Sequence, residues 1–371
     1  MYIDTPEKLQ KLCEAIKTAD NICFDTEFMR ERTFFPILCL IQLGVDGKQY
    51  AVDPLAGMDL TPLLEILTSD KLIILHSGRQ DLEIIYNLTK KLPKNVFDTQ
   101  IAAMVCGFGD QASYQQLVAD ILKKHVNKAE RYTDWAARPL SSSQIEYALS
   151  DVEYLPELYK FLNDKIEKEN RRLWLISEEE SLVNAQYYAE NFDDAWLKVK
   201  HREKKNCDLG VLQQVSKWRE IKAREFDRPR RRIIGDDQLV EIALRPPKTE
   251  EALKKVRNLN ISSSHIPSLL QAVEAGLAIA VEDKPRMKPR PKKTPDAGVV
   301  ELLKILLKVK CEENKLAPKL LASTEDIEKF ALGEDAPFLH GWRAEVFGKT
   351  AQNLVAGNIS FKVENGKMKI T

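Results

Sequence analysis

The stretch NICFDTEF, residues 21–28, most constrains the fold, because it places two carboxylates inside an otherwise apolar strand. Asp25 and Glu27 lie two residues apart, so both point to the same face of a sheet. Neighbouring carboxylates in a low-dielectric interior repel each other and are costly to desolvate unless a positive charge joins them. The stretch therefore raises the question of which positive charge makes an acidic strand tolerable.

Around this stretch, short apolar runs alternate with helical patterns up to about residue 170. Further strands are expected at 36–45, 49–54 and 71–76, with turn signals at Gly44 and at Asp46-Gly47. Helices are expected at 60–69, 79–91, 99–107, 114–125 and, as one long helix after three serines that offer N-caps, 144–169. Three strands in close succession, followed by alternating helices and strands, predict an α/β domain with a mixed sheet.

Beyond residue 200 the patterns are helical, except for a hairpin expected across Asn365-Gly366. The segment KPRMKPRPKKTP, residues 284–295, is rich in proline and basic residues and predicts an extended linker. The helical segments before and after it look like two copies of one small domain. The predicted division is an α/β domain at 1–172, a helical connector at 173–205, a first helical domain at 206–282, the linker at 283–297 and a second helical domain at 298–371.

Charge is distributed unevenly along a chain of zero net charge. Residues 1–200 carry 23 Lys and Arg against 32 Asp and Glu, whereas residues 201–300 carry 22 against 14. An acidic part followed by a basic segment is expected when the second part attracts a polyanion. A solvated, self-neutralising surface explains the same numbers equally well.

Several classes of protein find no support in the sequence. The six cysteines include no CxxC pair, which disfavours a thiol zinc site and fits a reducing cytoplasm. The N-terminus has no signal-peptide core, and the longest apolar stretch is too short for a membrane span. GxGxxG, Walker and GxSxG motifs are absent from the sequence, so we expect no nucleotide cofactor and no serine hydrolase.

Two further acidic positions complete a candidate metal site. Asp81 opens a helix directly after a buried strand, and Tyr147 and Asp151 share one face of a later helix. Taken singly, Asp81 could serve the helix dipole, while the other two could be a packed Tyr and a solvated Asp. Taken with Asp25 and Glu27, they supply converging oxygen ligands of the kind that two Mg²⁺ or Mn²⁺ ions require. Bound metal would supply the missing positive charge.

Three motifs carry a resemblance to a known family. FDTEF, then HSGRQDLEIIYN with FDTQIAA, then TDWAARPLSSSQIEYALSDVEYLPELY resemble the successive motifs of the DEDD exonuclease superfamily. Tyr147, four residues before Asp151, resembles the tyrosine subclass, and DWAARPL is similar to the ribonuclease D family. The two helical segments resemble tandem HRDC domains, although VRNLNISSSHI in the first lacks an expected glycine.

The resemblance implies a ribonuclease H-like α/β exonuclease domain followed by two small all-α HRDC-like domains. It implies a 3′→5′ exoribonuclease that trims structured RNA such as tRNA precursors and releases nucleoside 5′-monophosphates. Asp25, Glu27, Asp81 and Asp151 would bind the two metal ions, and Tyr147 would orient the attacking water. Two alternatives stay open: a 3′→5′ DNA exonuclease and a catalytically silent RNA-binding scaffold. We expect a cytoplasmic monomer with RNA as its partner.

Seven residues are candidates for substrate binding: Phe28, His76, Trp135, Arg138, Arg230, Arg231 and Arg232. Phe28 could stack on the terminal base or belong to the core. Trp135 and Arg138 could line the pocket or serve only packing. The arginines, with Arg228 and the linker residues Lys284, Arg286, Lys288 and Arg290, are expected to contact phosphates. Because every proposed metal ligand precedes residue 170, removing residues 206–371 is expected to spare cleavage of short oligonucleotides.

Overall fold

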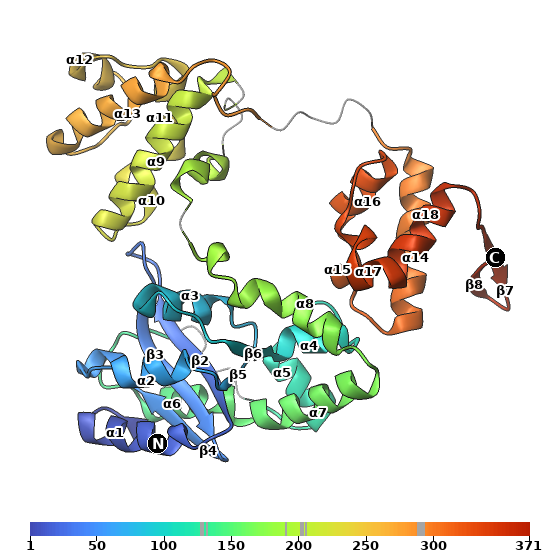
Figure 1. The fold of residues 1–371 in the computed structure, drawn as a ribbon. Helices are drawn as coiled ribbons and strands as arrows, with labels where there is room; N and C mark the ends of the chain where they lie inside the picture. The colour runs from blue at the N-terminus through green and yellow to red at the C-terminus, as the bar shows by residue number, and fades with distance from the viewer. Residues whose placement is uncertain (127–129, 131–132, 190, 201–203, 205, 288–293) are drawn as a thin grey trace. The chain divides into compact units, whose positions relative to one another are not determined.

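The computed structural model describes residues 1–126, 130, 133–189, 191–200, 204, 206–287 and 294–371 (Figure 1). These residues form two compact units. The first comprises Met1–Glu27, Leu38–Tyr187 and Pro291–Thr371, and the second comprises Phe28–Ile37 and Tyr188–Arg290. Within the described residues, no helix combines the length and the apolar character that crossing a membrane requires.

A six-stranded mixed sheet forms the centre of the first unit, in the order β1-β4-β3-β2-β5-β6. Its strands are β1 (Tyr2–Ile3), β2 (Asn21–Met29), β3 (Ile37–Val45), β4 (Lys48–Val52), β5 (Leu72–Leu75) and β6 (Asn95–Asp98). β5 runs parallel to β2 and β6, whereas β4 runs antiparallel to β3. The mixed sheet and its four predicted strands are confirmed. β1 and β6 were not predicted, because two and four residues are too few for a clear alternation.

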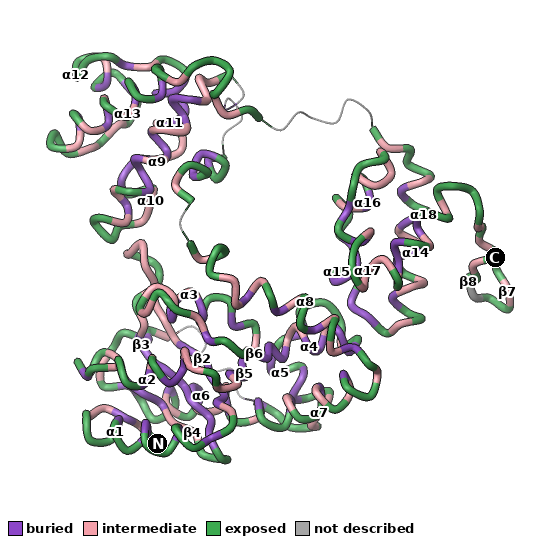
Figure 2. The backbone as a smooth tube through the Cα atoms, in the orientation of Figure 1, coloured by how far each residue is buried: buried purple, intermediate pink, exposed green. Residues whose placement is uncertain are grey.

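Helices surround this sheet (Figure 1). They are α1 (Pro6–Lys17), α2 (Thr61–Leu67), α3 (Arg79–Thr89), α4 (Thr99–Val105), α5 (Tyr114–Leu117), α6 (Ser142–Glu153), α7 (Leu155–Lys168) and α8 (Arg172–Val183). Short turns of 3-10 or π helix lie at Pro54–Ala56, Val118–Leu122, Ala185–Tyr187 and Phe192–Lys198. Figure 2 shows that the buried residues follow the strands and the inner sides of the helices.

The single long helix predicted over 144–169 is wrong, because the chain breaks at Tyr154 between α6 and α7. Pro156 lies in the first turn of α7, where its missing N–H is tolerated, and in a continuous helix it would clash with the preceding turn. The backbone amide of Tyr154 donates instead to the Tyr114 hydroxyl, at 2.9 Å. The break ends α6 two residues after Asp151.

α8 was expected to lie in a connector, but it packs within the first unit. Leu175 is completely buried in the same apolar cluster as strand residues Cys23, Ile74 and Phe97. Glu179 is 8% exposed, and its carboxyl accepts a hydrogen bond of 2.6 Å from the backbone amide of Asp98. The compact unit therefore extends past residue 172.

The second unit is helical and has its own apolar core. Its helices are α9 (Leu209–Glu225), α10 (Arg230–Ile233), α11 (Asp236–Leu244), α12 (Glu250–Leu253) and α13 (Ile266–Ala278). The Asp227 carboxylate accepts hydrogen bonds from the backbone amides of Phe34 and Phe35, at 2.9 and 3.0 Å. The Arg230 guanidinium lies 4.8 Å from the Phe34 ring centroid. Through these contacts the segment between β2 and β3 packs as part of the second unit.

The chain ends in a further helical group and a hairpin. The elements are α14 (Ala297–Asn314), α15 (Pro318–Leu321), α16 (Thr324–Ala331), α17 (Gly341–Arg343), α18 (Lys349–Val355), β7 (Phe361–Glu364) and β8 (Lys367–Ile370). β7 and β8 pair antiparallel across Asn365 and Gly366, whose φ angles of 52° and 74° suit a tight hairpin turn. The predicted hairpin is confirmed.

This C-terminal group packs against helices of the first unit. The rings of Trp174 and Trp342 stack with centroids 4.7 Å apart, and Arg343 forms a 2.6 Å ion pair with Glu178. Leu320 belongs to the apolar cluster of the sheet. Removal of residues 206–371 would therefore uncover apolar surface of the first unit, so the expected cleavage of short oligonucleotides by such a truncation depends on whether the truncated chain stays folded.

Arg171 offers a direct test of this interface. Its guanidinium donates to the carbonyls of Val105 (2.7 Å) and Lys315 (3.3 Å), and the residue is 8% exposed. Arg171→Ala should lower the free energy of unfolding by roughly 2–4 kcal/mol, because it leaves buried carbonyls unpaired. Arg172→Ala, whose partly exposed side chain pairs with Glu167, should cost less than about 1 kcal/mol. Urea unfolding measures both, and equal losses would contradict the interface.

Candidate active site

The structure brings the four predicted acids together. Asp25 and Glu27 lie on β2, Asp81 in the first turn of α3 and Asp151 near the end of α6. Burial raises the pKa of Asp25 well above its usual range, and the charges of Asp81, Asp151 and Glu27 raise it further. A carboxyl group feels such charges only at short range. Residues distant in the sequence therefore form one acidic cluster.

Asp81 is held by a partner that the sequence reasoning missed. Its side chain is buried, and its Oδ1 accepts a hydrogen bond from the hydroxyl of Thr26, which lies between Asp25 and Glu27 on β2. Burial raises the pKa of Asp81 to about 6, although the hydrogen bond from Thr26 opposes the shift. The only sequence signal for this role is a polar residue on the inward-facing side of an apolar strand.

Two contacts position α6, one with the sheet and one with α5. A Cβ atom on Gly44 of β3 would lie 3.2 Å from the carbonyl oxygen of Val152, so glycine permits the close approach of α6. The Tyr114 hydroxyl donates to the Ser150 carbonyl at 2.9 Å, one residue before Asp151. Tyr114 is thus a second residue missed from the sequence, where it resembled an ordinary helical aromatic.

A small pocket of about 60 Å³ opens at the cluster and is lined by Phe24, Asp25, His76, Tyr114, Asp151 and Leu155. His76 Nδ1 lies 3.0 Å from Thr99 Oγ1, and that hydroxyl donates to the Leu75 carbonyl. The His76 Nδ1–H must therefore be the donor. Burial lowers the pKa of His76, which favours a neutral ring, and its buried Nε2 makes no hydrogen bond within the described residues.

The chemistry of the cluster fits hard divalent cations. Carboxylate oxygens are the ligands that Mg²⁺ and Mn²⁺ prefer, and bound positive charge would offset the repulsion that raises the pKa of Asp25. Over the part of the chain that the structure describes, no three His, Cys, Asp or Glu side chains already stand in a ligating arrangement. The fit to divalent cations therefore rests on the type of ligand, carboxylate oxygen, and on the negative charge that the four acids share.

The aromatic candidates differ in exposure. Tyr147 on α6 is 8% exposed, and its ring centroid lies 6.0 Å from that of Trp135. Trp135 is 3% exposed, so it supports Tyr147 from within the protein. Phe28 is half-buried at the end of β2, which leaves part of its ring accessible.

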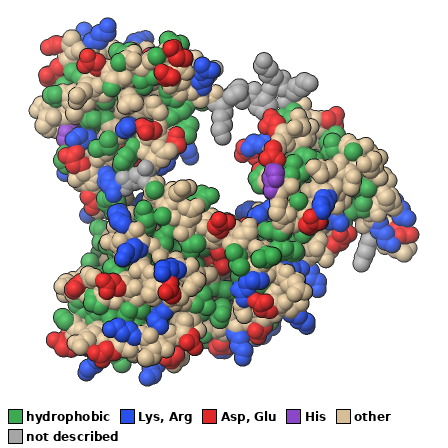
Figure 3. Space-filling view, in the orientation of Figure 1, with side chains coloured by type: hydrophobic (Ala, Val, Ile, Leu, Met, Phe, Trp, Pro, Cys, Tyr) green, Lys and Arg blue, Asp and Glu red, His purple; other side chains and the backbone are tan. Residues whose placement is uncertain are grey.

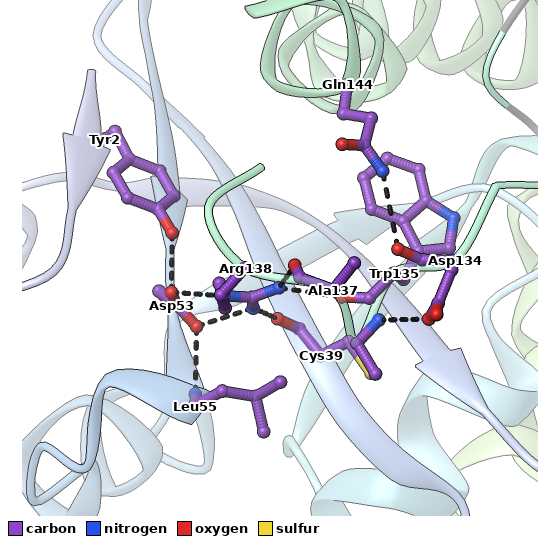
Figure 4. Close-up of polar contacts among 10 residues, drawn as sticks. Tyr2, Cys39, Asp53, Leu55, Asp134, Trp135, Ala137, Arg138 and Gln144 are labelled. Carbon is purple, nitrogen blue, oxygen red and sulfur yellow. Dashed lines mark hydrogen bonds and ion pairs between the residues drawn. The ribbon is translucent and has the colours of Figure 1, made fainter. Parts of the chain in front are cut away.

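The guanidinium of Arg138 is engaged in hydrogen bonds within the protein (Figure 4). Its Nε and Nη2 donate to the two carboxylate oxygens of Asp53 at 2.7 and 2.6 Å, and Nη2 also donates to the Cys39 carbonyl. Nη1 donates to the carbonyls of Trp135 and Ala137. Of the two roles expected for Arg138, these contacts favour packing, in which it fixes the loop that carries Trp135.

Arg138→Lys should separate these roles, because lysine keeps the charge but cannot form the bidentate pair with Asp53. We expect a loss of roughly 2–4 kcal/mol in the free energy of unfolding. The KM for an RNA oligonucleotide should stay within about twofold. Urea unfolding and steady-state kinetics on the same preparation measure both quantities. A higher KM with unchanged stability would restore the substrate role.

The candidate phosphate-binding arginines of the second unit differ in whether they are paired or exposed. The Arg230 guanidinium forms an ion pair with Glu220 in addition to its contact with Phe34. Arg228, Arg231 and Arg232 are exposed. Lys288 and Arg290 of the linker lie outside the described residues. On the visible face in Figure 3, basic and acidic side chains are interspersed, so charge alone marks no continuous basic band there.

Comparison with known proteins gives a consistent result. Residues 1–167 match the family described as 3′-5′ exonuclease, and residues 208–263 match the HRDC domain. Ribonuclease D of Bartonella henselae is 41% identical over 364 residues, covering 95% of this chain and 89% of that protein. Ribonuclease D of Sphingobium indicum is 40% identical, covering 100% and 98%. The crystal structure of Escherichia coli RNase D, an exoribonuclease involved in structured RNA processing, matches with a TM-score of 0.80 at 29% identity, covering 96% and 98%.

Proposed function

Because this chain belongs to the ribonuclease D family, we propose that it is a 3′→5′ exoribonuclease that depends on divalent metal ions. Its substrates are structured RNAs such as tRNA precursors, and its products are nucleoside 5′-monophosphates. The proposal is supported mainly by geometry: Asp25 and Asp151 line one pocket, and Asp81 accepts a hydrogen bond from Thr26, which lies between Asp25 and Glu27. An acidic cluster of this kind has little structural value without bound cations.

In this proposal the four acids hold two divalent cations, Mg²⁺ or Mn²⁺. When bound, the cations supply the charge that stabilises an in-line phosphoryl displacement. The burial of Asp81 and its hydrogen bond from Thr26 keep one carboxylate fixed before the ions arrive. Such pre-organisation lowers the cost of assembling the site.

Tyr147 has the role of holding the attacking water. Its phenol comes from the same helix as Asp151, one turn earlier, and its ring is supported by buried Trp135. A rigid donor and acceptor at this place can orient a water molecule towards the terminal phosphate. His76 lines the pocket together with Asp25 and Asp151, and its Nε2 has no hydrogen-bond partner in the described part of the chain, which makes it a candidate contact for the 3′-terminal nucleotide.

The helical parts have different roles in this proposal. The HRDC domain of the second unit binds the RNA backbone through its exposed arginines, without reading sequence. The C-terminal group is proposed to be a second HRDC-like domain that mainly supports the catalytic unit, given the Trp174–Trp342 stack and the Arg343–Glu178 pair.

Replacing Arg228, Arg231 and Arg232 by Ala together should weaken binding to folded RNA. For every phosphate that the variant no longer neutralises, the slope of log K against log salt should become shallower by roughly 0.7–0.9. A matched triple change to Ala at Lys308, Lys349 and Lys362, also basic residues at the surface, removes the same charge from the C-terminal group and should leave the slope unchanged. Fluorescence anisotropy at several salt concentrations measures both, and identical slopes for the two triples would contradict the binding role.

The experiment that tests the proposed function compares two polymers. A 3′-labelled tRNA precursor and single-stranded DNA of matched length are incubated with the purified full-length protein and Mg²⁺, Mn²⁺ or EDTA. We expect progressive shortening of the RNA from its 3′ end with either metal and none with EDTA. Preferential shortening of the DNA would favour the DNA exonuclease alternative, and inertness towards both would contradict the proposal.

A further inference from the structure

Asp98, the last residue of β6, has a buried carboxylate that the proposed mechanism does not use. It is 1% exposed, and the parallel pairing of β5 with β6 sets it beside Leu75. Both residues lie at the carboxyl edge of the sheet, and Leu75 directly precedes the turn that leads into α3 and Asp81. A buried charge needs hydrogen-bond partners, and these partners reveal what Asp98 holds.

The carboxylate of Asp98 joins two segments that are distant in the sequence. Its Oδ1 accepts from the backbone amides of Gln100 at 2.8 Å and Ile101 at 3.3 Å, which caps α4 in the usual way. The same Oδ1 accepts from the amide of Ser77 at 3.0 Å, and Oδ2 accepts from the amide of Gly78 at 3.0 Å. Capping α4 requires only the hydrogen bonds from Gln100 and Ile101. The hydrogen bonds from Ser77 and Gly78 therefore show a second structural role of Asp98.

The turn that Asp98 holds is unfavourable by itself. Ser77 has a φ of 58°, in the left-handed region that non-glycine residues adopt at a cost. Gly78 is so close to Leu75 that a Cβ atom would lie 2.5 Å from its side chain. Such a turn persists only when its surroundings over-determine it, and the two hydrogen bonds to Asp98 supply that constraint.

The Ser77–Gly78 turn, once held by Asp98, sets the position of Asp81. The backbone amide of Leu82 donates to the Gly78 carbonyl at 3.0 Å, so α3 begins on the turn itself. Asp81 lies three residues after Gly78, in the first turn of that helix. Any relaxation at Ser77 and Gly78 would move the start of α3 and the carboxylate of Asp81 with it.

Glu179 of α8 supports Asp98 from behind. Its carboxyl accepts from the Asp98 backbone amide at 2.6 Å and is 8% exposed. Burial raises the pKa of Glu179 to about 9, and the neighbouring charge of Asp98 contributes to the shift. The raised pKa favours the neutral form of Glu179, which accepts the N–H without placing a second negative charge beside Asp98.

We propose that Asp98 is a positioning residue, which holds the Ser77–Gly78 turn and so fixes Asp81, with Glu179 securing Asp98 through its backbone amide. The inference deepens the proposed function and rests on it for the role of Asp81. Residues that orient metal ligands from outside typically change metal affinity or activity by 10–100-fold when replaced.

Four variants of the full-length chain test the proposal. Asp98→Asn removes the acceptor for one turn amide at nearly constant size, whereas Asp296→Asn changes another aspartate N-cap, that of α14, far along the chain. Glu179→Gln keeps a neutral acceptor, and Glu179→Ala removes it. The readouts are kcat and KM on a short RNA, Mg²⁺ affinity by calorimetry, and amide hydrogen exchange of the peptide 77–82.

Asp98→Asn and Glu179→Ala should lower kcat and Mg²⁺ affinity by roughly 10–100-fold, with KM within about twofold and faster exchange over 77–82. Glu179→Gln and Asp296→Asn should behave as the wild type. Wild-type kcat and Mg²⁺ affinity in folded Asp98→Asn would overturn the proposal. If that variant does not fold, equal behaviour of Glu179→Ala and Glu179→Gln would overturn it. A wild-type protein without nuclease activity would refute the proposed function instead, since calorimetry and exchange still report on the turn.

Discussion

Asp25→Asn is expected to reduce RNA hydrolysis by at least about 10³-fold, which corresponds to about 4 kcal/mol of transition-state stabilisation. The substitution keeps the size of the side chain but removes one negative ligand from the centre of the acidic cluster. Cation binding at the site depends on that charge. Single-turnover assays with saturating Mg²⁺ provide the measurement, and circular dichroism confirms that the variant is folded.

The same substitution should stabilise the metal-free protein at neutral pH. The folded-state pKa values of Asp25 and Asp81 are raised, to about 6 for Asp81, so folding favours their protonated forms. Below the ordinary carboxyl pKa near 4, both groups are protonated in the folded and the unfolded protein, and burial then lowers the free energy of unfolding by nothing. As the pH rises through the folded pKa, the free energy of unfolding decreases. Asp25→Asn removes its share of this loss, so its Tm in EDTA should exceed that of the wild type at pH 7 and match it near pH 4.

Asp164→Asn is the matched control for Asp25→Asn. Asp164 is exposed on α7 of the same unit, and its replacement makes the same change of charge. It should alter neither the rate nor the Tm in EDTA. Near-normal turnover of pure, folded Asp25→Asn would contradict the assignment of the acidic cluster to metal binding.

Tyr147→Phe is expected to lower kcat by roughly 10²–10⁴-fold, as is typical when a positioned acid–base group is lost. The ring stays in contact with Trp135, so packing is preserved, and only the hydroxyl that would orient water is removed. Because this group stabilises the transition state more than bound RNA, KM and Mg²⁺ affinity should change little. Steady-state kinetics and calorimetry separate these quantities.

Tyr159→Phe removes a hydroxyl from another aromatic of the same unit, whose ring packs edge-on against Phe97 at 4.8 Å. It should keep the wild-type kcat. A rise in KM with unchanged kcat for Tyr147→Phe would make Tyr147 a binding residue and would leave the orientation of water to another group.

Motifs with strong local constraints could be predicted from the sequence. Asp25 and Glu27 lie in one strand, Tyr147 and Asp151 lie in one helix as expected, and Asp25 and Asp151 line the same pocket. Asn365 and Gly366 could be placed in a hairpin because few residues adopt positive φ at low cost. In these cases backbone geometry and side-chain spacing alone decide the outcome.

Roles that depend on distant partners could not be predicted. The sequence left open whether Arg138 lines the substrate pocket or serves packing, because its partner Asp53 lies 85 positions earlier in the chain. Asp98 has the same sequence signature as any helix cap, and its second pair of hydrogen bonds exists only because β5 and β6 are neighbours. α8 falls in the segment predicted to be a helical connector, but tertiary packing buries its Leu175 and Glu179.

Product analysis on two RNAs tests the central claim most directly. A linear RNA with a free 3′-OH and a circular RNA of the same sequence are incubated with the full-length protein and Mg²⁺, and the products are separated by chromatography. Water attacking the terminal phosphodiester should release nucleoside 5′-monophosphates one at a time from the linear RNA and leave the circle intact. Nucleoside 3′-monophosphates, or cuts within the circle, would contradict a 3′→5′ exonuclease built on Asp25, Glu27, Asp81 and Asp151.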